Sequence, residues 1–326
     1  MAPDMTEANQ PVLAIFGPTG SGKSAVAEAV ADRIPAEIVS ADSMQVYRGL
    51  PVLTNHPARP TRLVGIWELD HAASVGEYAE LAQQAVDEAL TEGITPLVVG
   101  GTGLYLRAAL VDLHLPPAPL LGARPRFEEL YDSLGPERAH ALLAERDPRA
   151  AETVHANDRR RVVRALELAD AGESLARSPS RLWTRETRHP TLLFGLDVPK
   201  EVLAARIEAR TRAMFEHGVE EEVARAAAGP LSSTAAQVIG LREITELPRE
   251  EATVAIVRRT LQYAAYQRKW MRRIPGLVPL AADHSPANVA EALLAAAREQ
   301  FTFLGQQEEG ASGTRKGEAD HTGRAV

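Results

Sequence analysis

A glycine-rich motif of eight residues constrains the fold of this chain more than any other feature. Residues 17–24 are GPTGSGKS and match the pattern G-x-x-x-x-G-K-[ST]. The apolar run Pro11–Gly17 precedes the motif and is typical of a buried strand, and Lys23–Ile34 follows it with helical spacing. A strand, this turn and a helix in that order predict a phosphate-binding loop.

The residue types of the motif suit a diphosphate or a triphosphate. Glycines let the backbone curl around one anion, and the helix N-terminus adds a favourable potential. The predicted loop consists of Gly17, Pro18, Thr19, Gly20, Ser21, Gly22, Lys23 and Ser24. Lys23 would supply a full positive charge, and the Ser24 hydroxyl would bind Mg²⁺. The motif alone specifies neither the phosphate compound nor the reaction.

Further apolar runs alternate with helical patterns along the chain. Glu37–Ser40, Pro96–Val99 and Thr191–Val198 are predicted strands. Val75–Glu92 is a predicted helix, and Pro199 is expected at the first position of another. This alternation indicates an α/β fold with a parallel sheet covered by helices on both faces.

The middle of the chain differs in character from its two ends. Residues 113–189 carry helical patterns and proline breaks without a clear strand. We therefore predict a P-loop α/β core of residues 11–112 and 190–304, interrupted by a helical insertion of residues 113–189. Residues 1–10 and 305–326 are polar or glycine-rich and are predicted to be disordered.

Composition excludes several classes of protein. The 326 residues contain no cysteine, which excludes disulfides, thiolate metal sites and a cysteine nucleophile. The N-terminus is polar and is not expected to be a signal peptide, and no run of about 18 apolar residues is present to span a membrane. We therefore expect a cytoplasmic protein. The net charge of −8 argues against non-specific coating of nucleic acid but is compatible with a local basic groove.

The residues that follow the predicted strands indicate which reaction the site could catalyse. Nucleotide hydrolases usually carry an acid at a strand end to help hold Mg²⁺, but here the strand Pro96–Val99 is followed by Gly-Gly-Thr-Gly. Asp42 follows the strand Glu37–Ser40, and strand carboxyl ends border the ligand crevice. Asp42 would then accept a hydrogen bond or a proton from a nucleophile. Alternatively, Asp42 caps a turn or a helix, and Thr102 merely belongs to a turn.

Seven segments together resemble the tRNA dimethylallyltransferase family, from about Val12 to Pro279. They are GPTGSGKS (17–24), SADSMQVYRG (40–49), VVGGTGLYLRAAL (98–110), HANDRRRVVRALEL (155–168), GLDVPKEVLAARIEARTRAM (195–214), TAAQVIGLREI (234–244) and QYAAYQRKWMRR (262–273). Each alone is weak, but seven in this order are highly specific.

The resemblance implies a donor, an acceptor and a role for several residues. Members of the family bind dimethylallyl diphosphate in the phosphate loop and transfer its dimethylallyl group to the adenine 3′ of the anticodon, in tRNAs that read codons beginning with U. By resemblance, Thr19 to Ser24 hold the diphosphate with Mg²⁺, and Arg210 adds a second positive contact. Asp42 is then the base for the adenine amine, with Lys23, Thr102 and Arg210 as the other catalytic residues.

The resemblance also implies contacts with the anticodon stem-loop of tRNA, and a monomeric enzyme. The residues expected to touch tRNA are Asp42, Ser43, Met44, Gln45, Thr102, Arg124, Arg160, Arg161, Arg164, Gln237, Gly240 and Arg242. At about 100° per residue, Arg160, Arg161 and Arg164 share one helix face, as binding to an RNA backbone needs. A solvated basic face is the alternative.

The chain departs from the family pattern at three places. Leu53–Pro57 replaces Gly-Thr-Ala-Lys-Pro, the His-His-Leu-x-Asp stretch is missing, and Tyr263–Gln267 replaces Tyr-Ala-Lys-Arg-Gln. Three alternatives therefore stand beside the leading hypothesis. They are an adenylate isopentenyltransferase acting on a free nucleotide, a small-molecule P-loop kinase with Asp42 as base, and an RNA-binding protein without activity.

Overall fold

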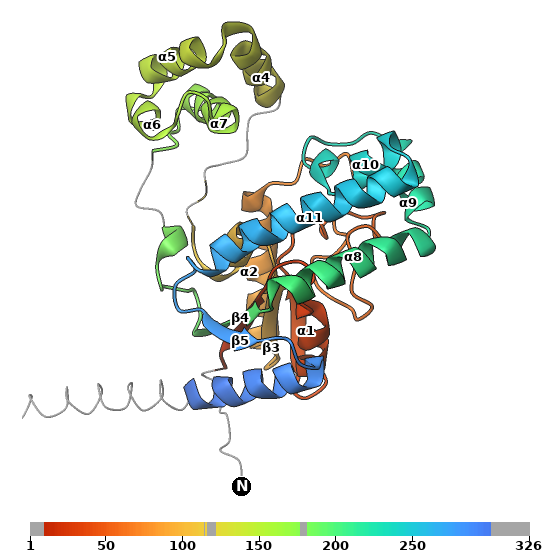
Figure 1. Cartoon of the computed structure of the whole chain (residues 1–326). Helices are drawn as coiled ribbons and strands as arrows, with labels where there is room; N and C mark the ends of the chain where they lie inside the picture. Colours follow the sequence, from red (N-terminus) through yellow and green to blue (C-terminus); the bar gives the residue numbers. More distant parts are fainter. Residues whose placement is uncertain (1–9, 114, 116–121, 177–180, 301–326) are drawn as a thin grey trace, which may run out of the picture.

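A five-stranded parallel sheet forms the centre of the protein (Figure 1). The computed structural model describes residues 10–113, 115, 122–176 and 181–300. The strands are β1 (Val12–Phe16), β2 (Ala36–Ser40), β3 (Thr95–Gly100), β4 (Thr191–Asp197) and β5 (Val278–Ala281), in the order β2-β3-β1-β4-β5. The predicted α/β fold with a parallel sheet is confirmed. β5 was not predicted, because it is only four residues long and contains Pro279, and proline within a run argues against a strand.

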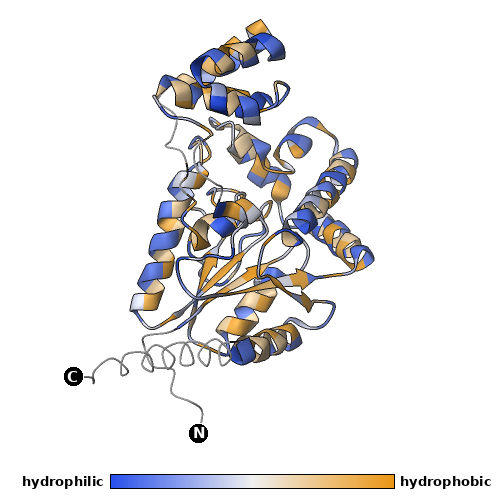
Figure 2. Cartoon of the chain, turned by 90° about the vertical axis from the view of Figure 1, so that its left-hand side faces the viewer, coloured by the Kyte–Doolittle hydropathy of each residue, from blue (hydrophilic) through white to orange (hydrophobic). Residues whose placement is uncertain are grey.

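Side chains of successive strand residues enter two separate cores, one on each face of the sheet. Val12, Ala14 and Phe16 of β1 belong to one core, whereas Leu13 and Ile15 belong to the other. Both faces are covered, so every residue of β1 and β3 is buried. Figure 2 shows the consequence, since the strands are mostly apolar and the surrounding helices are amphipathic.

Helices cover both faces of the sheet. α2 (Val75–Thr91), α3 (Gly103–Leu110), α9 (Val219–Ala227) and α10 (Leu241–Glu246) contribute to the first core. α1 (Lys23–Ala31), α8 (Lys200–Glu216) and the helix of residues 286–300 contribute to the second. α11 (Arg249–Met271) packs on α8, α10 and α3 and supplies residues to both cores. The short 3₁₀ segment η2 (Ala235–Gln237) precedes α10.

The start of α8 corrects one prediction by a single residue. Pro199 was expected at the first helical position, but it is the N-cap of a helix that begins at Lys200. Its φ of −52° suits a helix, whereas its ψ of 142° is extended. The chain therefore turns into the helix one residue later than the sequence pattern suggests.

The middle of the chain folds into four helices with a core of their own. They are α4 (Ala123–Leu134), α5 (Pro136–Arg146), α6 (Pro148–Thr153) and α7 (Arg159–Asp170), and they lie apart from the sheet (Figure 1). Phe127, Tyr131, Leu143 and Leu166 are buried among them. The described part of the insertion contains no strand.

The predicted disordered ends lie almost wholly outside the described residues. At the N-terminus only Gln10 is described, and its side chain donates a hydrogen bond of 2.7 Å to the Thr95 hydroxyl. The whole segment 305–326 is outside the described part. No helix in the described ranges combines the length and apolarity needed to cross a bilayer.

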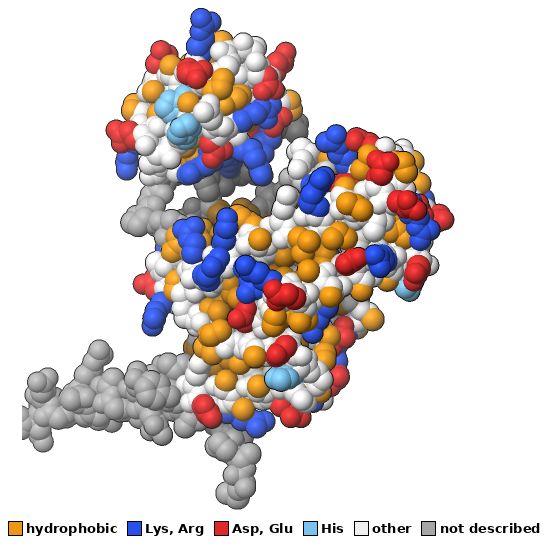
Figure 3. Space-filling model, viewed as in Figure 1, with side chains coloured by type: hydrophobic (Ala, Val, Ile, Leu, Met, Phe, Trp, Pro, Cys, Tyr) orange, Lys and Arg blue, Asp and Glu red, His pale blue; other side chains and the backbone are white. Residues whose placement is uncertain are grey.

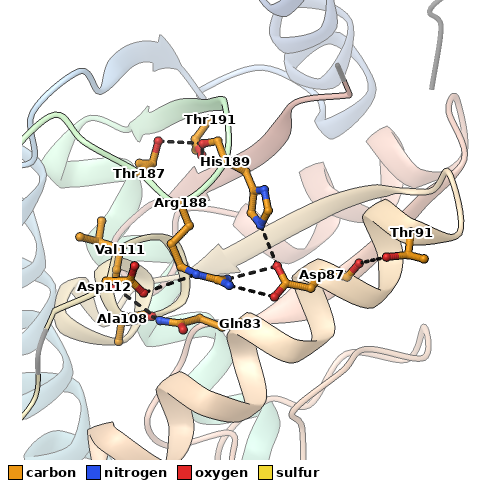
Figure 4. Close-up of polar contacts among 10 residues, drawn as sticks. All are labelled: Gln83, Asp87, Thr91, Ala108, Val111, Asp112, Thr187, Arg188, His189 and Thr191. Carbon is orange, nitrogen blue, oxygen red and sulfur yellow. Dashed lines mark hydrogen bonds and ion pairs between the residues drawn. The ribbon is translucent and has the colours of Figure 1, made fainter. Parts of the chain in front are cut away.

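Asp87 of α2 ties the returning end of the insertion to the core (Figure 4). Arg188 makes two hydrogen bonds to this carboxylate, of 2.9 and 3.2 Å, and His189 contacts it at 2.7 Å. Burial raises the pKa of Asp87, but the bonds and charges of Arg188 and His189 outweigh burial and hold that pKa below its usual value. Arg188 also lies 3.5 Å from Asp112, on the outgoing end. The two ends of the insertion are thus fixed side by side.

Candidate active site

The glycine-rich segment forms a loop between β1 and α1. Gly20 and Gly22 have φ angles of 80° and 87°, a left-handed conformation that strains any residue with a side chain. Gly22 is the N-cap of α1, so Lys23 and Ser24 begin the helix, and the first N–H groups of a helix have no partner within it. This is the geometry of an anion site at a helix N-terminus.

A cleft opens beside this loop. Its polar lining residues are Thr19, Lys23, Ser24, Asp42, Gln45, Thr54, Asn55, Arg210, Thr211, Thr260 and Tyr263. Its apolar lining residues are Met44, Leu53, Met214, Ile239 and Ile256. The cleft therefore offers both charged and apolar contacts to a ligand.

Two cations and one carboxylate share this cleft. Burial lowers the pKa of Lys23, the negative charge of Asp42 raises it, and the positive charge of Arg210 lowers it again. Burial likewise lowers the pKa of Arg210, and Asp42 opposes that shift. The Arg210 Nε atom is buried without a hydrogen-bond partner. Since buried cations are unfavourable unless they are paired, the site as a whole favours an added anion.

The side chain of Asp42 lines the cleft, and one of its carboxylate oxygens also stabilises a turn. Its Oδ1 atom accepts a hydrogen bond of 3.0 Å from the backbone N–H of Met44, as in an Asx-turn. The turn-capping alternative thus accounts for one oxygen. The same residue lines the cleft with Lys23 and Arg210, so the structure brings these three predicted residues together.

Thr102 lies at the end of β3 and links two neighbouring elements. Its hydroxyl accepts a bond of 3.2 Å from the Ser43 backbone N–H and lies 3.1 Å from the Tyr263 hydroxyl. Burial, followed by the charge of Asp42, raises the pKa of Tyr263 to about 12, so its hydroxyl stays protonated near neutrality. The sequence analysis missed Tyr263, because the sequence does not reveal that α11 reaches the strand ends.

One of the three segments that depart from the family pattern, Leu53–Pro57, contributes residues 53–55 to the lining of the cleft. The side chain of Gln45, which is predicted to touch tRNA, donates to the backbone oxygens of Thr54 and Asn55, at 3.3 and 2.8 Å. The buried carboxylate of Glu222 in α9 accepts from the N–H groups of Val52 and Leu53. Glu222 was also missed, since a third glutamate in a Glu-Glu-Glu run gives no sign of burial.

The arginines of the insertion divide into two kinds. The fully buried side chain of Glu167 holds Arg124, at 2.7 and 3.1 Å, and Arg164, at 3.0 Å. Arg124 and Arg164 therefore help to stabilise the helical bundle, and their contact with tRNA stays a prediction. Arg160 and Arg161 are exposed, and within the described ranges neither side chain forms an ion pair.

Basic side chains also gather where the insertion approaches the core. Figure 3 shows Lys and Arg along the edge of the insertion that faces the core, and again on the core surface below it. Such clusters on an acidic protein suit an RNA backbone.

The remaining predicted contacts lie near the cleft. Gln237 is exposed, and Arg242 is exposed with a bond of 2.9 Å to Glu246. Gly240 has a φ of 103°, and a Cβ atom there would lie 2.5 Å from Leu53. Hence the backbone at Gly240 packs closely against Leu53, which lines the cleft.

Protein side chains alone would hold a metal ion poorly here. In the parts of the chain that are described, no three His, Asp or Glu side chains form a metal-binding group. Ser24 begins α1 beside Lys23 and lines the cleft. A single hydroxyl suits Mg²⁺ that is held mainly by phosphate oxygens and water.

Comparison with known proteins gives consistent matches over most of the chain. A family model described as IPP transferase matches residues 45–274, and one described as isopentenyl transferase matches residues 10–64. A tRNA dimethylallyltransferase of Anaeromyxobacter dehalogenans is 39% identical over 289 residues, which is 84% of this chain and 93% of the relative. A tRNA dimethylallyltransferase of Streptomyces coelicolor is 36% identical over 278 residues, which is 81% of this chain and 88% of the relative.

Solved structures agree with the sequence matches. The tRNA isopentenylpyrophosphate transferase of Bacillus halodurans superposes with a TM-score of 0.63 at 28% identity, covering 91% of this chain and all of that one. A eukaryotic dimethylallyltransferase acting on tRNA superposes with a TM-score of 0.68 at 26% identity, covering 84% of this chain and 74% of that one.

Proposed function

Because the chain belongs to the tRNA dimethylallyltransferase family, we propose that it transfers a dimethylallyl group from dimethylallyl diphosphate to the exocyclic amine of an adenine in tRNA. The target is the adenine 3′ of the anticodon, in tRNAs that read codons beginning with U. The products are N6-dimethylallyladenosine and diphosphate.

The observation that carries the proposal is the mixed lining of the cleft. The two buried cations Lys23 and Arg210 share it with one carboxylate, Asp42, so a bound anion is favourable there. The same cleft is also lined by Leu53, Met214 and other apolar residues. Dimethylallyl diphosphate has both features, since its diphosphate is multiply charged and its five-carbon chain is apolar.

The reaction follows from where the charges lie. The bond between the allylic carbon and the diphosphate oxygen breaks, and the delocalised allylic cation makes this break feasible. Lys23, Arg210 and the loop N–H groups stabilise the negative charge that grows on the leaving diphosphate. The adenine nitrogen forms the new C–N bond to the allylic carbon, and Asp42 takes the proton that the amine loses.

We propose that Ser24 holds Mg²⁺ together with the diphosphate oxygens. The ion, when bound, neutralises part of the diphosphate charge. Thr102 contacts the target nucleotide from the end of β3, and Tyr263 orients the Thr102 hydroxyl. The adenine must leave its stack to reach the cleft, as in other enzymes that modify bases.

Two features favour tRNA over a free nucleotide or a kinase substrate. The insertion is a folded helical bundle with exposed arginines, which a free nucleotide does not need. The end of β3 carries Gly100 to Gly103 in place of the acid that many nucleotide hydrolases use. We further propose that the protein acts as a monomer in the cytoplasm, where its tRNA substrate is found.

The decisive experiment is incubation with dimethylallyl diphosphate, Mg²⁺ and unmodified tRNA, followed by mass analysis of the nucleosides. We expect dimethylallyladenosine and free diphosphate in equal amounts. Parallel reactions with adenosine monophosphate, and with ATP in place of the donor, test the two alternatives. Prenylation of the free nucleotide alone, or consumption of ATP with a phosphorylated product, would refute the proposal.

The exposed arginines of α7 give a second test. Replacing Arg160 and Arg161 by alanine should weaken tRNA binding and flatten its salt dependence by about one unit of slope per lost phosphate contact. The affinity is measured at several salt concentrations, with Arg212→Ala of the exposed face of α8 as control. An unchanged slope would make Arg160 and Arg161 an ordinary solvated face.

A further inference from the structure

The donor loop and the end of β3 separate just beyond the sheet. β1 and β3 pair as far as Phe16 and Gly100, and the N–H of Gly17 donates to the Gly100 oxygen at 3.2 Å. After this bond one chain becomes the phosphate loop and the other turns into α3. The backbone N–H of Thr19 and the carbonyl of Gly101 therefore have no partner in the sheet, and unpaired buried backbone groups are unfavourable.

The side chain of Gln267 in α11 bridges these two groups. Its Oε1 atom accepts a hydrogen bond of 2.8 Å from the Thr19 N–H, and its Nε2 atom donates one of 2.9 Å to the Gly101 oxygen. Gln267 is only 1% exposed, although it carries a primary amide. The carboxamide thus acts as a peptide group would, because it accepts from one chain and donates to the other.

The Gln267 carboxamide packs directly against the backbone at Gly101. A Cβ atom on Gly101 would lie 2.3 Å from the Gln267 Nε2 atom and 2.8 Å from the Gly17 oxygen. Gly101 is therefore needed for the bridge to form. Of the natural side chains of this length, methionine neither accepts nor donates well, and ionised glutamate accepts but does not donate.

Gln267 shares its helix with the residue that orients Thr102. Tyr263 lies four residues earlier in α11, on the same helix face, and its hydroxyl lies 3.1 Å from that of Thr102. One rigid helix thus contacts the loop that holds the donor and the strand end that faces the acceptor.

We propose that Gln267 is a positioning residue that holds the phosphate loop at a fixed distance from the acceptor side of the cleft. The proposal rests on the proposed function and names a residue that sets the geometry of the donor site. Gln267 occupies the Thr19 N–H, and the Ser21 N–H donates to the Pro18 oxygen at 3.0 Å. The N–H groups of Gly20 and of residues 22–24 therefore remain for the diphosphate. Without these two hydrogen bonds of Gln267, we expect the loop to lose the conformation in which its N–H groups point at the diphosphate.

Gln267→Met keeps the length of the side chain and removes both hydrogen bonds. We expect the dissociation constant for inorganic diphosphate with Mg²⁺, measured by calorimetry, to rise by about tenfold or more, since a net hydrogen bond or an unsatisfied buried group corresponds to roughly that factor. The KM for dimethylallyl diphosphate should rise with it, and the affinity for tRNA should stay within about twofold. Gln262→Met, on the exposed face of the same helix, is the matched control.

Gln267→Glu gives a test that does not depend on how well the methionine variant folds. A protonated carboxyl accepts with one oxygen and donates with the other, as the carboxamide does. Its diphosphate affinity relative to the parent should therefore be poor at neutral pH and recover as the pH falls.

Two results would overturn the proposal. One is a diphosphate affinity of Gln267→Met within about twofold of the parent, and the other is an equal loss of tRNA affinity, which indicates general damage. The diphosphate measurement needs no turnover. A parent protein that binds diphosphate but transfers no dimethylallyl group would refute the proposed function without refuting the role of Gln267.

Discussion

Replacement of Asp42 by asparagine is expected to slow dimethylallyl transfer by about 10²- to 10⁴-fold, the range that a positioned general base typically contributes. Asparagine keeps the size of the side chain and the Oδ1 atom that accepts from the Met44 N–H, so the turn should survive. What it loses is the ability to take the proton that the adenine amine releases.

The charge change in Asp42→Asn gives the same experiment a second readout. Asp42 is the carboxylate that opposes the burial of Lys23 and Arg210. Without its negative charge, the site should bind diphosphate as tightly as the parent or more tightly. A slow enzyme with undiminished donor affinity is therefore the expected combination, and damage to the fold would lower both quantities.

The measurement for Asp42→Asn is single-turnover transfer with saturating donor and tRNA, with tRNA affinity determined in parallel. Asp70→Asn, at an exposed position, is the control for the loss of a carboxylate. A rate within about threefold of the parent would make Asp42 a purely structural turn residue. The proton would then need another acceptor, such as the departing diphosphate.

The sequence predicted the parts of the fold that depend on local pattern. β1 and β3 are buried on both faces, so their apolar runs are continuous and easily recognised. The phosphate loop follows from glycines at the two left-handed positions Gly20 and Gly22. β5 is apolar as well, but it is a four-residue edge strand that contains Pro279, so its pattern does not distinguish it from a loop.

The proximity of Lys23 and Asp42 could also be predicted, because both residues follow strands of the same parallel sheet. Lys23 follows β1 and Asp42 follows β2, and the carboxyl ends of parallel strands lie at one edge of the sheet. Arg210 is different, since it lies in the middle of α8 and only the family resemblance singled it out. The structure brings Arg210 to the same cleft.

Several polar partners that the sequence does not reveal are far apart in the chain. Gln267 is 248 residues from Thr19, and Glu222 is 169 residues from Leu53. Arg124 is 43 residues from Glu167, and the sequence pattern does not show that this glutamate is buried. Local pattern gives no information on such pairs, because tertiary packing decides which polar groups become buried.

Lys23→Ala should produce the largest loss on the donor side. Lys23 contributes a full charge to both the bound diphosphate and the transition state, so its removal should weaken donor binding and slow turnover together. Loss of one preorganised group that stabilises a developing negative charge typically costs about 10²- to 10³-fold in rate. Arg210→Ala should act in the same direction but less severely, because Lys23 and the N-terminus of α1 remain.

The stability of the Lys23→Ala protein distinguishes a ligand-binding role from a structural one. Burial and the nearby charge of Arg210 both disfavour the Lys23 ammonium in the free protein. Removing it should therefore leave the melting temperature of the free protein unchanged or higher, while the stabilisation given by diphosphate largely disappears. A side chain that holds the fold together would show the opposite, with a lower melting temperature and undiminished stabilisation by diphosphate.

The dependence of donor affinity on pH is a further test of whether the Lys23 ammonium binds the diphosphate. Its pKa is lowered by burial, so the free protein loses this charge at a lower pH than an exposed lysine would, as the pH rises through the lowered value. Donor affinity should consequently fall at alkaline pH, and Lys23→Arg should remove that fall because guanidinium stays protonated. Binding of diphosphate across the alkaline range tests this, with Lys200→Ala at an exposed site as control. If Lys23→Ala kept the parent turnover and the parent alkaline profile, the glycine-rich loop would not be the donor site.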